Sequence, residues 1–216
     1  MRLALGAAVV ALAGTAASAS SLINMDFGTQ FGTPGAGHGA AAAQPGIWNA
    51  ITATTGSVAL NDIAGAPSGA SIALPAGNFA FSFNNAGTSG DFEALLDDGL
   101  DLGGTGATDT FVVTGLAAGN YQVYVYAWAP DSATFIASTS VNGSAPANSG
   151  GAFGGNYAAG VTHNVFNVTL TAGQPLNITT TTISGFSTLN GIQIVPSPGA
   201  MALLGMGGLA AARRRR

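Results

Sequence analysis

Carboxylates form the densest group of chemically versatile side chains in this 216-residue sequence. Six of the nine acidic residues lie within nineteen positions, namely Asp91, Glu93, Asp97, Asp98, Asp101 and Asp109. Calcium ions take about six to eight oxygen ligands, which aspartates and loop carbonyls can supply. A calcium site here would use Asp97, Asp98 and Asp101, although their spacing is not that of an EF-hand loop. The alternative is a solvated acidic loop, and the sequence leaves both interpretations open.

Groupings that indicate catalysis are sparse. Two carboxylates between Asp91 and Asp101 would meet the separation of about 5–10 Å that glycoside hydrolysis needs in many folds, so the pattern has little specificity. His38 and His163 lie far apart and the chain has no cysteine, which argues against zinc. There is neither a Gly-x-Ser-x-Gly elbow nor a phosphate loop with lysine. We therefore expect a protein that is not an enzyme, with a glycoside hydrolase as the less favoured alternative.

Aromatic residues suggest a second kind of chemistry, which is sugar binding. Tyr124, Tyr126 and Trp128 alternate along one predicted strand, so their side chains share one face. Aromatic rings stack on the C–H faces of sugars, and these three residues are the candidate platform for an extracellular polysaccharide. The alternative is packing in the core, because such rings bury a large apolar area.

The N-terminus has the three parts of a secretory signal. Met1 and Arg2 form a short positive region, and residues 3–13 are apolar. Ala17 and Ala19 fit an A-x-A cleavage site, with Ser20 as the first mature residue. We therefore expect export through the Sec machinery.

The C-terminus is also built in three parts. Pro196, Ser197, Pro198 and Gly199 form a stiff turn-like stretch, because proline fixes φ and removes backbone donors. The apolar run 199–212 has fourteen residues, fewer than the roughly 20 that span a bilayer. Four basic residues end the chain, and the positive-inside rule would keep them cytoplasmic: Arg213, Arg214, Arg215 and Arg216. This predicts a tail that inserts into the membrane transiently.

Residues 195–216 resemble a PEP-CTERM sorting signal, in which a Pro-Glu-Pro motif, an apolar helix and a basic end follow one another. The resemblance implies processing by an exosortase-like sorting protease. The sequence departs from the motif at Ser197, where the family has glutamate. An ordinary C-terminal membrane anchor is the alternative interpretation of this transmembrane-like helix.

All five basic residues lie in the two ends, at Arg2 and at 213–216. Residues 20–196 therefore hold nine acids and no lysine or arginine, a formal net charge of −9 compared with −4 for the whole chain. Such a body cannot neutralise phosphates, which excludes nucleic-acid binding. An anionic surface also attracts divalent cations, and Ca²⁺ is the one cofactor we consider.

The pattern between the two ends is all-β. Short runs suited to strands are separated by Gly, Asn, Asp, Ser and Pro, at 23–27, 57–60, 71–74, 79–83, 110–113, 115–128, 134–141, 163–170, 176–183 and 189–195. Asn142-Gly143 is a strong hairpin signal, and only 92–96 suggests a helical turn. Residues 28–46 and 144–160 are typical of long loops. We predict a signal peptide at 1–19, a single β-sandwich of jelly-roll type at 20–194 and the sorting tail at 195–216.

The body also resembles known extracellular domains. The Gly-Leu-x-x-Gly-x-Tyr-x-Val unit at 115–123 and the strand 189–194 are similar to elements of galactose-binding-like and malectin-like jelly rolls. Taken together, the sequence predicts an exported, non-enzymatic protein of the cell surface or extracellular matrix. The alternative is a carbohydrate-binding module of the same polymer layer.

Overall fold

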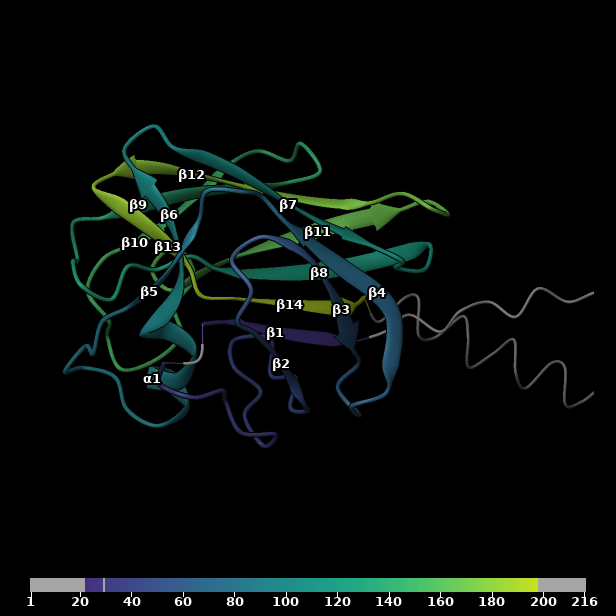
Figure 1. The fold of residues 1–216 in the computed structure, drawn as a ribbon, viewed down its shortest axis with the longest axis horizontal. Coiled ribbons are helices and arrows are strands. Elements are labelled where there is room, and N and C mark those ends of the chain that lie inside the picture. The colour runs from purple at the N-terminus through teal and green to yellow at the C-terminus, as the bar shows by residue number, and fades with distance from the viewer. Residues whose placement is uncertain (1–21, 29, 198–216) are drawn as a thin grey trace, which may run out of the picture.

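A computed structural model describes residues 22–28 and 30–197 of the chain. Three antiparallel or mixed sheets account for nearly all of its regular structure (Figure 1). The five-stranded sheet has the order β11 (His163–Leu170), β8 (Gly119–Tyr126), β14 (Gly191–Pro196), β1 (Ile23–Phe27), β2 (Trp48–Ile51). The six-stranded sheet has the order β10 (Ala147–Gly150), β9 (Ile136–Val141), β12 (Leu176–Ser184), β7 (Thr108–Thr114), β4 (Pro67–Leu74), β3 (Gly56–Asn61). A smaller sheet pairs β13 (Phe186–Leu189), β6 (Asp98–Gly104) and β5 (Phe79–Ser82), and the helix α1 (Asp91–Leu96) precedes β6.

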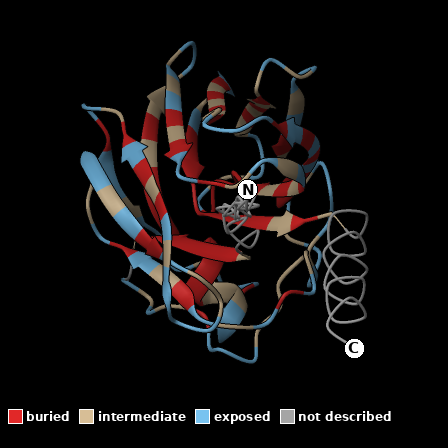
Figure 2. Cartoon of the chain, turned by 90° about the vertical axis from the view of Figure 1, so that its right-hand side faces the viewer, coloured by how far each residue is buried: buried red, intermediate tan, exposed pale blue. Residues whose placement is uncertain are grey.

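The two large sheets enclose the main core. Alternate residues of each strand point inward, as Met25 and Val123 do on one sheet and Ile178 on the other. Rings from both sheets meet directly, because the centroids of Phe27 and Phe111 lie 6.1 Å apart. Figure 2 shows the buried residues running through the strands of the interior, with exposure concentrated in loops and at outer faces. The predicted all-β sandwich is confirmed.

The outer face of the five-stranded sheet is covered as well. All five residues of β1 are buried, although strand alternation points Asn24 and Asp26 away from the main core. A second cluster of apolar and aromatic side chains lies over this face, and it includes Trp48, Leu95 and Tyr126. The helix α1 and the two long loops predicted at 28–46 and 144–160 supply this cover.

The hairpin between β9 and β10 turns at Asn142-Gly143, as the sequence predicts. Asn142 and Gly143 both have positive φ, 49° and 74°, as a type I′ turn requires. The N–H of Ser144 closes the turn on the carbonyl of Val141 at 2.9 Å. Four strands lie where no strand was expected, namely β2, β6, β10 and β13.

The described chain ends at the start of the predicted tail. Pro196 is the last residue of β14 and is buried, and the N–H of Ser197 donates to the carbonyl of Asn120 at 2.8 Å. The predicted cleavage residues Ala17, Ala19 and Ser20 lie outside the described residues, as do Pro198, Gly199 and the four C-terminal arginines. Within residues 22–28 and 30–197, no helix is long and apolar enough to cross a membrane.

Candidate functional site

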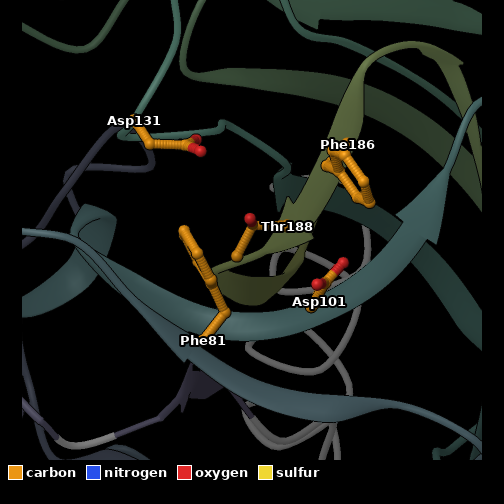
Figure 3. Close-up of a pocket in the computed structure, with 5 residues that line it drawn as sticks. All are labelled: Phe81, Asp101, Asp131, Phe186 and Thr188. Carbon is orange, nitrogen blue, oxygen red and sulfur yellow. The ribbon is translucent and has the colours of Figure 1, made fainter.

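An open pocket of about 230 Å³ lies on the outer face of the small sheet. Its walls are two phenylalanines, two aspartates and a threonine, which Figure 3 shows converging from three strands and one loop: Phe81, Asp101, Asp131, Phe186 and Thr188. An aromatic wall with a few polar groups is typical of a ligand site.

Strand register places these side chains on one face. Asp101 of β6 is paired with Phe79 of β5 on one side and with Thr188 of β13 on the other. The neighbouring positions Leu100 and Leu189 point to the opposite face and are buried in the main core. The small sheet thus contributes one face to the sandwich and presents the other to solvent.

A glycine sets the position of Phe186. Gly185 has a φ of +67°, a region that other residues rarely adopt. A Cβ atom at this position would overlap the ring of Phe135, so the ring packs against the bare backbone. The rings of Phe135 and Phe186 then meet at a centroid distance of 6.0 Å. This contact supports the Phe186 wall of the pocket.

Large apolar side chains are exposed around the pocket. Phe186 is 53% exposed and Phe79 is 72% exposed, and Phe83 just after β5 is 45% exposed. Isolated exposed apolar residues are common on proteins, but a group of phenylalanines beside a pocket indicates a contact surface. Phe79, Phe81 and Phe83 alternate along one expected strand, so a shared face was predictable from the sequence, whereas Phe186 lies outside every expected strand.

The carboxylates of the pocket can accept further hydrogen bonds. One oxygen of Asp101 accepts a hydrogen bond from the N–H of Gly103 at 2.7 Å. An ionised carboxylate has about four acceptor sites, so the remaining ones can face a ligand. The exposed Asp131 approaches from the loop after β8, as Figure 3 shows. The hydroxyl group of Thr188 adds a donor.

The predicted aromatic platform is not an exposed surface. Tyr124, Tyr126 and Trp128 do share the outer face of the five-stranded sheet, but Tyr126 is 0% and Trp128 is 2% exposed. The hydroxyl group of Tyr126 donates to Gln193 at 2.6 Å and accepts from the N–H of Ala41 at 2.8 Å. The indole N–H of Trp128 donates to the carbonyl of Gly151 at 2.8 Å. Because the loops cover these rings, the prediction of an open platform is wrong, and core packing is the better interpretation.

Beside this buried face, His38 joins the two covering loops to α1. Its Nε2 lies 2.7 Å from the hydroxyl oxygen of Tyr157, and its Nδ1 lies 3.6 Å from a carboxylate oxygen of Asp91. Burial lowers the pKa of His38, and the charge of Asp91 opposes that shift. Burial raises the pKa of Tyr157 far above its usual range, so its hydroxyl group stays protonated. The hydrogen bond between His38 and Tyr157 therefore fastens the two covering loops to each other.

The three predicted calcium ligands do not share a site. One oxygen of Asp97 accepts from the N–H of Asn85 at 2.8 Å and from the hydroxyl group of Thr88 at 2.7 Å. Asp98 accepts from the N–H of Phe31 at 3.0 Å, whereas Asp101 lines the open pocket. No group of three or more His, Asp or Glu side chains in the part of the chain that the structure describes could hold a metal ion. The expected ligand set is therefore wrong.

One carboxylate that sequence analysis passed over lies buried beside Asp98. Asp26 of β1 is 0% exposed, and neither of its oxygens makes a hydrogen bond of normal geometry, although the side chain of Thr33 is close enough to lower its pKa. Its position in an alternating apolar–polar run predicts a half-exposed strand residue. Nothing local in the sequence signals the cover over its face.

Comparisons with known proteins add little. No protein-family model matches the sequence, and no curated protein matches it. Solved structures of an exo-β-1,3-galactanase from Phanerochaete chrysosporium are similar to it at 17% identity, one with β-1,3-galactotriose and one with galactose. The matches cover 63% of this chain and 36% of that chain, with TM-scores of 0.33 and 0.30. This chain thus corresponds to about a third of that enzyme, and a likeness this low carries no argument.

Proposed function

We propose that this chain is an exported protein of the cell surface or extracellular matrix whose β-sandwich binds a neutral polysaccharide without cleaving it. One observation carries the proposal, namely the open pocket between Phe81 and Phe186, with carboxylates in its wall. The pocket combines the two contacts that a sugar ring makes best, an aromatic surface for its C–H face and acceptors for its hydroxyl groups.

The carboxylates specify hydroxyl donors. Asp101 and Asp131 can accept hydrogen bonds from sugar hydroxyl groups, and such bonds to a charged acceptor are stronger than neutral ones. The hydroxyl group of Thr188 can bond a ring or hydroxyl oxygen of the same sugar. A ligand rich in hydroxyl groups satisfies this set better than an apolar one does.

The charge of the body favours an uncharged glycan. Residues 20–196 contain nine acids and no lysine or arginine, so no cationic side chain can pair with a uronate, sulfate or phosphate. Asp101 and Asp131 would in addition repel an anionic sugar placed between them. A neutral hexose polymer is therefore the expected ligand class.

The size of the pocket sets how much of the polymer it holds. Its volume of about 230 Å³ is below the roughly 300–1,000 Å³ of sites that enclose a drug-sized ligand. We expect one sugar ring to occupy it, with neighbouring rings crossing the exposed Phe79.

The two ends of the chain support the location. An N-terminal signal ending at Ala19 and a tail with Pro196, Ser197 and four final arginines fit Sec export and a PEP-CTERM-like sorting step by an exosortase. The likeness of the body to galactose-binding-like and malectin-like jelly rolls belongs to the same proposal. A polymer-binding domain delivered in this way would fasten to the extracellular layer.

Binding of the full chain to an array of neutral and acidic glycans, followed by calorimetry with the retained glycan, tests the proposal. Phe186→Ala removes the exposed aromatic wall, and Asp101→Asn removes a charged acceptor while keeping the Gly103 hydrogen bond. We expect each variant to bind at least about tenfold more weakly. For Asp101→Asn the size follows because a hydrogen bond to a charged group contributes about 1.5–3 kcal/mol, and about 1.4 kcal/mol corresponds to a tenfold change in affinity.

Matched controls lie far from the pocket. Ile47→Ala removes another exposed apolar side chain, and Asp62→Asn neutralises a carboxylate in a surface turn. Both controls should bind like the wild type. Equal binding by all four variants, or retention of acidic glycans only, would refute the proposed pocket, and release of reducing ends from the bound glycan would make the protein a hydrolase.

A further inference from the structure

The buried carboxylates of Asp26 on β1 and Asp98 on β6 lie near one another where these two strands are in contact. Both residues are 0% exposed. A Cβ atom on Gly28 would lie 2.9 Å from the carboxyl carbon of Asp98, so that carboxyl group lies against the chain two residues after Asp26. Two residues of chain span at most about 7 Å. The two acids are therefore near neighbours, and their charges act on each other.

Three of the four carboxylate oxygens lack a hydrogen bond of normal geometry. These are both oxygens of Asp26, although the side chain of Thr33 is close enough to lower the pKa of this acid, and Oδ1 of Asp98, whereas Oδ2 of Asp98 accepts from Phe31. An ionised carboxylate buried without a partner is costly, because it has lost its hydration. No cationic side chain can compensate it, because residues 20–196 have no lysine or arginine. His38 in the covering loop is engaged by Tyr157 and Asp91.

A route from solvent reaches Asp98, the outer member of this pair. A second pocket of about 230 Å³ is lined by Asp98 together with Gly28, Gln30, Thr52 and Ser82. It opens at the side of the site where Asp98 lies. Water and a small ion can enter there, and the carbonyl groups and hydroxyl groups of its wall are further oxygen donors.

We propose that Asp26 and Asp98 together bind one calcium ion at the junction of β1 and β6, with access through the pocket lined by Gly28, Gln30 and Thr52. The donor set consists of oxygen atoms alone, which favours a hard cation over zinc or copper. Calcium accepts irregular coordination and long ligand distances, whereas magnesium demands a near-octahedral shell with several waters. The sequence pattern suggests three ligands, Asp97, Asp98 and Asp101. The proposed site keeps Asp98 and has Asp26 of β1 in place of the other two.

The test is calorimetric titration of the metal-free full chain with CaCl₂, paired with thermal unfolding. We expect one ion per chain, a Kd in the range of about 10⁻⁴–10⁻³ M that is common for extracellular modules, and a Tm that rises with calcium concentration. Asp26→Asn and Asp98→Asn should each weaken binding at least about tenfold. Asp62→Asn, in a surface turn, should bind as the wild type does.

Loss of binding in the two variants is separable from misfolding. Each substitution removes a buried charge and keeps the shape of the side chain, so the metal-free variants should unfold at the same temperature as the metal-free wild type or higher. Far-UV circular dichroism verifies the fold before titration. Absence of heat and of a Tm change up to 10 mM CaCl₂, or unchanged binding by either variant, would overturn the proposal.

Discussion

The domain should become more stable as the pH falls from neutral toward 4 when calcium is removed. Burial raises the pKa of Asp98 to about 6 from 3.8, although hydrogen bonds from the backbone of Phe31 and Gln30 oppose the shift. Burial, with the charge of Asp98, raises the pKa of Asp26 still further. The folded state therefore binds more protons than the unfolded chain between about pH 3.8 and pH 6. The contribution of Asp98 is fully present below about pH 3.8 and is lost as the pH rises through about 6.

The magnitude follows from the two pKa values. The interval between 3.8 and about 6, at about 1.4 kcal/mol for each pKa unit, corresponds to about 3 kcal/mol at neutral pH. Asp98→Asn abolishes this titration and keeps an oxygen to accept from the N–H of Phe31. Relative to the wild type, the variant should therefore gain about 3 kcal/mol of unfolding free energy between pH 3.5 and pH 7.5.

Urea unfolding in EDTA at several pH values, followed by the fluorescence of the two buried tryptophans Trp48 and Trp128, measures this gain. The comparison of variant and wild type at each pH cancels the opposite contribution of His38 and His163, whose pKa values burial lowers. A difference between the two proteins that is independent of pH would refute the reasoning. A variant less stable than the wild type at pH 7.5 would do so too.

Two further predictions concern the hydrogen bonds under the covering loop of the five-stranded sheet and the packing behind Phe186 in the pocket wall. Tyr126→Phe leaves the N–H of Ala41 without its partner under the covering loop and removes one of the hydrogen bonds to Gln193, so we expect a loss of about 1–3 kcal/mol by urea unfolding, and increased hydrogen exchange at Ala41 would identify the loop as the affected part. Gly185→Ala places a methyl group against the ring of Phe135 at a φ of +67°, so we expect a comparable loss together with weaker glycan binding; stability like that of the wild type would contradict the packing described for Phe186.

Strands with strong alternation could be predicted from the sequence, and strands defined by their partners could not. His163–Leu170 was expected at the bounds that the structure has, because its apolar residues Phe166, Val168 and Leu170 are separated by Asn167 and Thr169. Asp98–Gly104 contains two acids and three glycines, a composition typical of a turn. It is a strand because β5 and β13 pair with its two edges, and such pairing is invisible locally.

For the same reason, local sequence could not predict which residues form the candidate sites. Phe81 and Phe186 stand far apart in the sequence, and only β6 between their strands brings them to one pocket. For Tyr124, Tyr126 and Trp128 the shared face was predicted correctly, but the cover over it depends on hydrogen bonds such as that from Ala41 to Tyr126 across 85 positions. Periodicity predicts which face of a strand a side chain occupies, but it does not predict which segment of the chain covers that face.

A body without lysine or arginine must satisfy its acids by other means, and most of them follow one pattern. Asp91 accepts from the N–H of Gly35, Asp62 from the N–H groups of Ala64 and Ala66, and Asp97 from Asn85 and Thr88. Backbone N–H and hydroxyl groups thus replace the ion pairs that other proteins form, and each acid costs the loop around it some conformational freedom. Asp26 is fully buried, its oxygens make no hydrogen bond of normal geometry, and only the nearby side chain of Thr33 opposes the rise of its pKa. Its charge has to be compensated by a proton, which its raised pKa favours, or by an ion from outside the chain, and the calcium ion proposed above would take the place of that proton.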